Sequence, residues 1–230
     1  LHPHSENIAA WKEKEDSAAK EYTEEKDADW RSSHPQDAPA FDLAKELHKY
    51  IVDGPTQGQL VEDLLDQAFK KGDVDPTKPY GRLGQPLLVL IPTHPKIMSL
   101  DPNEDQKERY TEVVEMLIKR GADPTIKEKG LMEVSAGFRE VFFGYMEALE
   151  SMIKSVPSSE EREKFVNEVG LFNGYTRLID AALIGKEEAI EILLRYNVDR
   201  SIKGFNGWTA YKAAQRSRKI PDTVLNKLKV

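Results

Sequence analysis

The chain has 230 residues, of which 39% are hydrophobic and 32% are charged, and this composition excludes a wholly disordered protein. It has no cysteine, which excludes disulfides and cysteine-based chemistry, and its longest apolar run, residues 87–91, is far shorter than the roughly 20 residues of a membrane-spanning helix. Because of this short run we expect no membrane insertion. The net charge is −7 and the sequence has no basic stripe with interleaved aromatic residues, so we expect no nucleic-acid binding.

Residues 1–40 form a charged N-terminal arm. They carry ten acidic and five basic residues and therefore supply −5 of the net charge of −7. From Glu6 to Trp30 the arm is rich in Glu, Lys and Ala, with Trp11 and Tyr22 on a thin apolar stripe, which favours a helix. Two alternatives remain open, a helix packed across the first repeat unit and a mobile tail.

The rest of the chain repeats itself. The same apolar rhythm occurs as VVEMLIKRGADPTIK around Asp123 and as AIEILLRYNVDRSIK around Asp199. A second pair of matching stretches begins with Asn-Gly at Asn173 and Asn206, 33 residues apart, and Asp75 lies in a third copy of the turn, 48 residues before Asp123. A period near 33 is typical of repeat proteins, in which each helical hairpin buries its apolar face against its neighbour. We therefore predict stacked two-helix units.

Single residues mark where the helices should begin and end. Thr176 and Thr209 each follow an Asn-Gly pair, and their hydroxyls are suited to cap the helix that follows. Gly121 and Asn197 stand where a helix should stop in the left-handed conformation. Asp222, after a proline, should begin the last helix.

These elements resemble the ankyrin repeat family over residues 41–230. The helix starts read Thr-Arg-Leu-Ile from Thr176 and Thr-Ala-Tyr-Lys from Thr209, and one unit ends in Gly-Ala-Asp at Asp123. Neither the proline nor the histidine of the family signature Thr-Pro-Leu-His occurs at these two starts. The resemblance implies an all-α ankyrin-repeat solenoid of about four to five helix-turn-helix units with an N-terminal helical arm. The expected units are 41–83, 84–130, 131–173, 174–206 and 207–230.

Two insertions enlarge the second and third units, at residues 92–106 and 154–169. Insertions in repeat proteins map to loops on one side of the stack. We therefore expect both segments to lie outside the core.

The motifs of catalysis are missing from the sequence. It contains no Gly-x-Ser-x-Gly elbow, no phosphate-binding glycine loop and no His-Glu-x-x-His pair, so we expect no enzyme, no cofactor and no metal site. His2 and His4 flank a proline near the start of the sequence and make a poor metal site. His34 and His48 are interpreted as surface or helix-edge histidines.

The turns between the units are the candidate binding site. Stacking would align them along one edge, where basic and aromatic side chains alternate, and such residues dominate interface energetics. The alternative for each residue is an ordinary solvated turn. The candidate protein-binding residues, together with a histidine of the first insertion, are Lys78, Tyr80, Arg82, His94, Lys127, Lys129, Arg200, Lys203, Phe205 and Trp208.

The resemblance to ankyrin repeats implies a non-enzymatic module that binds another protein. The chain starts at Leu1 without a methionine, which favours export and a periplasmic or secreted location over the cytoplasm. In that setting it looks like exported bacterial ankyrin proteins that protect the cell by occluding a peptidoglycan hydrolase, with the first insertion or a lysine-bearing turn as the plug. The alternative is a cytoplasmic scaffold or a secreted effector that joins partner proteins, and an enzyme with a pocket beside an insertion is less favoured.

Overall fold

The structure, a computed structural model, describes residues 32–230 except 56–59, 82, 94–101, 130–132 and 172. This part of the chain is predominantly helical, which confirms the all-α class. Its one small sheet pairs β1 (Pro79–Tyr80) with β2 (Gln85–Pro86) in antiparallel fashion. Most of the N-terminal arm, with His2 and His4, lies outside the described residues.

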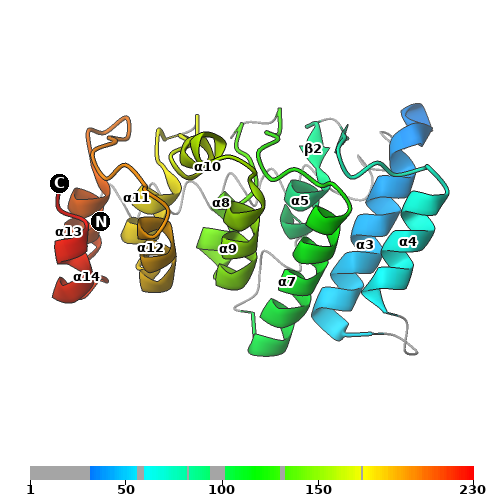
Figure 1. Cartoon of the computed structure of the whole chain (residues 1–230), viewed down its shortest axis with the longest axis horizontal. Helices are drawn as coiled ribbons and strands as arrows, with labels where there is room; N and C mark the ends of the chain where they lie inside the picture. The colour runs from blue at the N-terminus through cyan, green and yellow to red at the C-terminus, as the bar shows by residue number, and fades with distance from the viewer. Residues whose placement is uncertain (1–31, 56–59, 82, 94–101, 130–132, 172) are drawn as a thin grey trace.

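The helices form pairs that stand side by side in a single row (Figure 1). The main helix contacts join each pair to the adjacent pairs, for example α7 to α9 and α11 to α13. In chain order the pairs are α3 (Ala38–Asp53) with α4 (Val61–Lys70), α5 (Leu87–Leu90) with α7 (Glu104–Lys119), α8 (Phe138–Phe143) with α9 (Met146–Ser155), α11 (Arg177–Ile184) with α12 (Glu187–Leu194), and α13 (Ala210–Ser217) with α14 (Asp222–Lys227).

Short helical segments complete the chain. The 3-10 helix η1 (Pro35–Asp37) precedes α3, η2 (Ile91–Thr93) follows α5, and α10 (Ser159–Val166) follows α9. The four later pairs lie within the predicted ranges 84–130, 131–173, 174–206 and 207–230. The first helix begins at Ala38, so the boundary predicted at residue 41 lies inside it.

The helix ends that were predicted from single residues are confirmed. The Thr176 hydroxyl accepts a hydrogen bond from the Ile179 amide at 3.3 Å and begins α11, and Thr209 caps α13 in the same way. Gly121 and Asn197 have φ of 96° and 56°, the left-handed conformation expected after the second helix of a unit. The last helix, α14, begins at the residue after Pro221.

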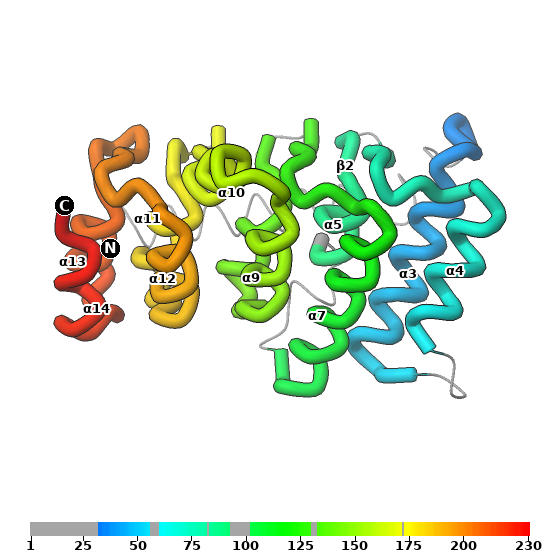
Figure 2. Tube along the Cα trace, in the orientation of Figure 1, coloured from blue at the N-terminus to red at the C-terminus, as the bar shows by residue number. Residues whose placement is uncertain are grey.

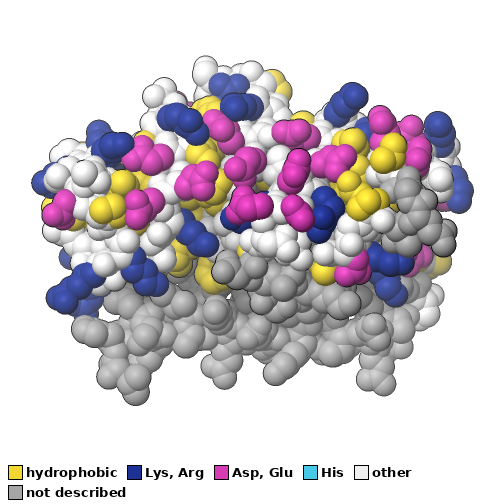
Figure 3. All heavy atoms as spheres, turned by 90° about the horizontal axis from the view of Figure 1, so that it is seen from below, with side chains coloured by type: hydrophobic (Ala, Val, Ile, Leu, Met, Phe, Trp, Pro, Cys, Tyr) yellow, Lys and Arg dark blue, Asp and Glu magenta, His cyan; other side chains and the backbone are white. Residues whose placement is uncertain are grey.

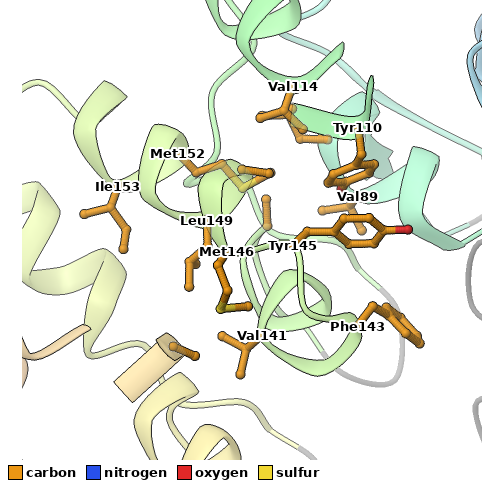
Figure 4. Packing of buried hydrophobic residues seen from close by; sticks show 14 of the residues in the cluster. Val89, Tyr110, Val114, Val141, Phe143, Tyr145, Met146, Leu149, Met152 and Ile153 are labelled. Carbon is orange, nitrogen blue, oxygen red and sulfur yellow. The ribbon is translucent and has the colours of Figure 1, made fainter. Parts of the chain in front are cut away.

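The core lies between the helices of the row, and Figure 4 shows a part of it to which α5, α7, α8 and α9 contribute side chains. The rings of Tyr110 and Tyr145 stack with their centroids 4.1 Å apart. The Tyr110 hydroxyl donates to the buried Glu140 carboxylate at 2.5 Å, which also accepts from the Gly137 amide at 2.6 Å. The Tyr110 hydroxyl and the Glu140 carboxylate, both buried in the core, are thus hydrogen-bonded.

The expectation that the insertions lie outside the core is wrong for residues 154–169. This segment forms α10, and Val156, Phe165 and Val166 are each at most 4% exposed. The helix forms because Ser158 caps it, accepting from the Glu161 amide at 3.1 Å. The first insertion is described only at its ends, where Glu104 already begins α7.

The interpretation of His48 as a surface histidine is also wrong. It is 5% exposed, and its Nε2 hydrogen-bonds the Ile91 carbonyl. The reason is that α3 packs against η2, so that its histidine meets a carbonyl of the next unit. His34 is partly exposed, as expected for a helix-edge residue.

Acidic side chains cross the face of the molecule that Figure 3 shows from below. Acidic residues occupy the first turns of the second helices, where a negative charge stabilises the helix N-terminus. They are Glu62 and Asp63 in α4, Glu104 and Asp105 in α7, Glu147 in α9, Glu187 and Glu188 in α12, and Asp222 in α14.

No helix in the part of the chain that the structure describes is long and apolar enough to span a bilayer.

Candidate binding site at the turn edge

Three turns contain the same pair of side-chain hydrogen bonds to an aspartate, which explains why the sequence repeats that aspartate. In each, Oδ1 of the aspartate accepts from the amide and from the hydroxyl of the residue two positions later, at 2.6–2.9 Å. Asn and Asp side chains that bond their own backbone in this way fix a turn. The pairs are Asp75 with Thr77, Asp123 with Thr125, and Asp199 with Ser201.

The Asn-Gly pairs build a second set of turns. Oδ1 of Asn173 accepts from the Tyr175 amide at 2.9 Å, and Oδ1 of Asn206 accepts from the Trp208 amide at 3.1 Å. The Phe205 amide donates to the Asn173 carbonyl at 3.1 Å, which joins two neighbouring turns. The turns all lie along one edge of the row, the upper edge in Figure 2. We call residues 71–81, 83–86, 119–129, 167–171, 173–176 and 195–208 the turn edge.

Two predicted aromatic residues do not face outward. Tyr80 is 6% exposed, and its hydroxyl donates to the Asp75 carbonyl at 2.8 Å and accepts from the Asp75 amide at 2.6 Å. It therefore closes its own turn, and its assignment to the binding surface is wrong. Trp208 is half-buried and packs against the core. Arg82 and His94 lie outside the described residues.

Phe205 is the most exposed aromatic residue among those described, at 72%. Its ring packs on Gly174, which has φ of 70° and where a Cβ atom would lie 2.5 Å from the ring. A glycine is needed there both for the backbone conformation and for this close contact. Lys203, two residues earlier, is also exposed, so a charged and an apolar side chain lie close in sequence on the same turn.

The other predicted basic residues have local contacts. The ammonium group of Lys78 lies 3.3 Å from the Asp75 carboxylate, and the Arg200 guanidinium donates to the Lys227 carbonyl at 2.9 Å. Lys129 is exposed, while its amide donates to the Leu83 carbonyl at 2.7 Å. Lys127, in contrast, lines a groove.

Lys127 lines a groove between the turn after α7 and the inserted helix α10. The groove has a volume of about 770 Å³, and we call it the α10 groove. This size falls within the ~300–1,000 Å³ of typical ligand pockets. Its apolar wall includes Ile118, Ala122, Val156, Phe165 and Val169, and its polar lining includes Asp123, Thr125, Lys127, Ser135, Glu161, Lys164 and Glu168.

Glu168 is the buried carboxylate of this groove. It accepts from the ammonium group of Lys127 at 2.9 Å, from the Ser135 hydroxyl, and from the guanidinium group of Arg177 at 3.0 Å. Burial alone would raise the pKa of Glu168, but Arg177, Ser135 and Lys127 together outweigh burial and lower it. The carboxylate is therefore ionised at neutral pH.

Arg177 lies behind Glu168 and is fully buried. Its guanidinium group is 4.2 Å from the ring centroids of both Phe138 and Phe165 and donates to the carbonyls of Ala136 and Phe165. Sequence reasoning missed this residue. The available signal was that an arginine follows Thr176, where the ankyrin signature has a proline.

The groove therefore has an apolar wall and a charged floor that is already ion-paired, which suits binding more than acid–base chemistry. Within residues 32–230, apart from the gaps given above, no group of three or more His, Cys, Asp or Glu side chains could hold a metal ion. Neither protein-family models nor curated proteins give a match to this chain.

Proposed function

We propose that the protein is a non-enzymatic binding module of the ankyrin-repeat type that holds a partner protein along its turn edge. The ankyrin assignment is supported by helix pairs in a row, by the threonine caps of α11 and α13, and by the left-handed residues Gly121 and Asn197. These features are what the 33-residue spacing of Asn173 and Asn206 implies for a repeat architecture.

The observation that carries the binding role is the exposure of Phe205. Exposing an aromatic residue to water to 72% is costly unless something covers it. The Phe205 ring packs on Gly174, and its backbone amide donates a hydrogen bond to the Asn173 carbonyl. Aromatic side chains on rigid supports are favoured contact residues in interfaces. Leu171, on the adjacent turn, is 54% exposed and adds apolar surface.

The test combines partner capture with a binding measurement. The protein is immobilised, partners from the source cells are identified by mass spectrometry, and the affinity of the purified partner is then measured for Phe205→Ala and Lys203→Glu. We expect Phe205→Ala to weaken binding about 30-fold, which corresponds to the ~2 kcal/mol of a hot-spot residue. Lys203→Glu should weaken it less, because the charge is exposed.

Leu60→Ala is the matched control, since Leu60 is also an exposed apolar residue, at 60%, but precedes α4. Equal affinity for the Phe205→Ala variant and the wild type would remove the turn edge from the site. A peptidoglycan hydrolase is the partner class that the resemblance supplies, and its activity should fall when the protein is added. Full hydrolase activity at saturating protein would exclude that partner while leaving the turn edge to be judged by the affinities.

A further inference from the structure

We propose that the C-terminal end of the row binds an acidic segment of the partner protein. This inference rests on the proposed function, because it names the chemistry of the partner that the turn edge holds. The binding surface consists of the eight exposed Lys and Arg side chains of residues 200–229, and we call it the basic end. It includes two candidate residues of the last turn, Arg200 and Lys203, and continues over α13 and α14.

Charge is distributed unevenly along the row. Residues 195–230 contain nine basic and two acidic residues and carry +7, whereas residues 32–194 contain 19 basic and 29 acidic residues and carry −10. The excess remains when the adjacent pair α11–α12 is included, since residues 174–194 contain two basic and four acidic residues and residues 174–230 therefore carry +5. An end unit needs a polar outer face, but solubility does not require charges of one sign.

Four cations of the basic end form no ion pair within the part of the chain that the structure describes. They are Lys203, Lys212, Arg218 and Lys219. Lys227 differs, because its ammonium group lies 2.6 Å from the Glu191 carboxylate. Unpaired charges of one sign repel one another, so a bound carboxylate would lower this repulsion and would accept charge-assisted hydrogen bonds.

Arg218 supplies an independent observation. The first helices α8, α11 and α13 each end before a residue in the left-handed conformation, which is Gly144 with φ of 89°, Gly185 with φ of 90° and Arg218 with φ of 55°. A side chain strains this conformation, whereas glycine adopts it freely. The chain thus has an exposed cation where glycine would fit the backbone better, and such strain is typical of functional sites.

Phe205 places an apolar contact beside these charges. Its turn is joined to the end of α14, because the Arg200 guanidinium group donates to the Lys227 carbonyl at 2.9 Å. Lys229 follows α14, and its ammonium group lies 5.7 Å from the centroid of the Tyr211 ring in α13. The last turn and the pair α13–α14 therefore form one end of the row (Figure 2). A segment that covers Phe205 also passes the cations of that turn.

The acidic part of the row limits which anion can bind. A nucleic acid or an anionic membrane carries its charge over a much larger extent than one helix pair, so it would also meet the carboxylates of residues 32–194. The neighbouring second helix, α12, already begins with Glu187 and Glu188. Repulsion disfavours a long polyanion, whereas a short acidic segment is confined to the basic end. The occupant is therefore a protein segment with a few Asp or Glu side chains beside an apolar one.

The test uses two peptides that differ only in charge, rhodamine-Asp-Glu-Leu-Phe-Glu-Asp-amide and rhodamine-Asn-Gln-Leu-Phe-Gln-Asn-amide. Binding of each peptide to the full chain is followed by fluorescence anisotropy. We expect the acidic peptide to bind about 10-fold more tightly than the neutral one at low salt, because its bonds to the basic end are charge-assisted. This preference should fall as salt is raised, because the cations are exposed and screened.

Lys212→Gln and Arg218→Gly should each weaken binding of the acidic peptide about 3-fold, the effect of one exposed ion pair. Lys45→Gln is the matched control, because Lys45 is an exposed lysine of α3, at the other end of the row. Arg218→Gly should also leave the urea midpoint unchanged or raise it, because glycine removes the left-handed strain. A lower midpoint with unchanged affinity would show that Arg218 serves the helix dipole instead, which overturns the proposal.

Equal affinity of the two peptides, or equal weakening by Lys45→Gln and Lys212→Gln, would contradict the proposal. Vesicles of phosphatidylserine and phosphatidylcholine and a single-stranded DNA are titrated in parallel, and tighter binding of either than of the acidic peptide would also overturn it. The captured partner separates this inference from the turn-edge function. Partner binding that is lost in Phe205→Ala but unchanged in Lys212→Gln and Arg218→Gly would overturn only the acidic chemistry. Partner binding that depends on the basic end and not on Phe205 would overturn only the turn-edge function.

Discussion

Glu168 joins three parts of the chain through one carboxylate. It follows α10, and its oxygens accept from Lys127 on a turn, from Ser135 before α8, and from Arg177 in α11. A buried ion pair adds little net stability when it forms, but losing one partner leaves an uncompensated buried charge. Arg177 is fully buried beside the rings of Phe138 and Phe165, so its positive charge depends on nearby carboxylates. Glu168 has the largest electrostatic effect among them and accepts from the guanidinium group.

We expect Glu168→Gln to lower the free energy of unfolding by about 3–5 kcal/mol at neutral pH, because it removes the charge of the carboxylate that accepts from the buried Arg177 at 3.0 Å. The folded-state pKa of Glu168 is lowered, so its stabilising contribution is present above the ordinary carboxyl pKa of 4.5 and is lost as pH falls through the folded value. The difference between wild type and variant should therefore shrink below about pH 4. Urea unfolding across this pH range measures it.

Glu163→Gln is the matched control, because Glu163 is an exposed glutamate on α10, and it should change the stability by less than about 0.5 kcal/mol. Burial raises the pKa of Asp180 to about 7, and the charge of Arg177 opposes this rise. A difference between wild type and Glu168→Gln that stays constant from neutral to acid pH would show that the carboxylate charge is not what stabilises Arg177.

At the scale of elements, the sequence predicts those features whose cause lies within a few residues. The caps at Thr176 and Thr209 and the left-handed Asn197 were predicted because each depends on local geometry alone. The inserted helix α10 was not, because its polar sequence resembles a loop and only Phe165 and Val166 bury it against the third unit.

The residues of the candidate site also fall into those that the sequence predicted and those that it missed. Exposed turn residues such as Lys203 and Phe205 were predicted from the repeat spacing alone. The orientation of Tyr80 was not, because its hydroxyl is held by backbone atoms of Asp75 in the folded turn. The Glu168–Arg177 pair was also missed, since nothing in the sequence places the end of an insertion beside the next unit's first helix.

The aspartate turns allow a test at this scale. Asp199→Ala removes two hydrogen bonds, to the Ser201 amide and hydroxyl, and should lower the free energy of unfolding by about 1 kcal/mol. Asp199→Asn keeps an oxygen in the same place and should cost less than half as much. The urea midpoint at constant slope measures both. If the Asn variant is as unstable as the Ala variant, the negative charge and not the turn geometry is what matters.

At the scale of the molecule, the row of helix pairs has no single centre. The main contacts of each pair are with its neighbours, so among the described residues the end pair α13–α14 packs against another pair on one side only. The turn edge and the acidic helix starts lie at different edges of the row, which gives a partner approaching the turns an asymmetric electrostatic field. Local stability should therefore vary along the row.

Two leucines with the same burial test this variation. Leu149 in α9 and Leu228 after α14 are both 0% exposed, and truncating a buried leucine to alanine costs about 3 kcal/mol. We expect Leu149→Ala to speed hydrogen exchange throughout α7, α9 and α11, because neighbours on both sides depend on it. Leu228→Ala should speed exchange only in α13 and α14, since the pairs that precede them in the chain keep their contacts with one another. Equal acceleration in α3 for both variants would mean that the row unfolds as one cooperative unit, and the stacking of semi-independent pairs would have to be abandoned.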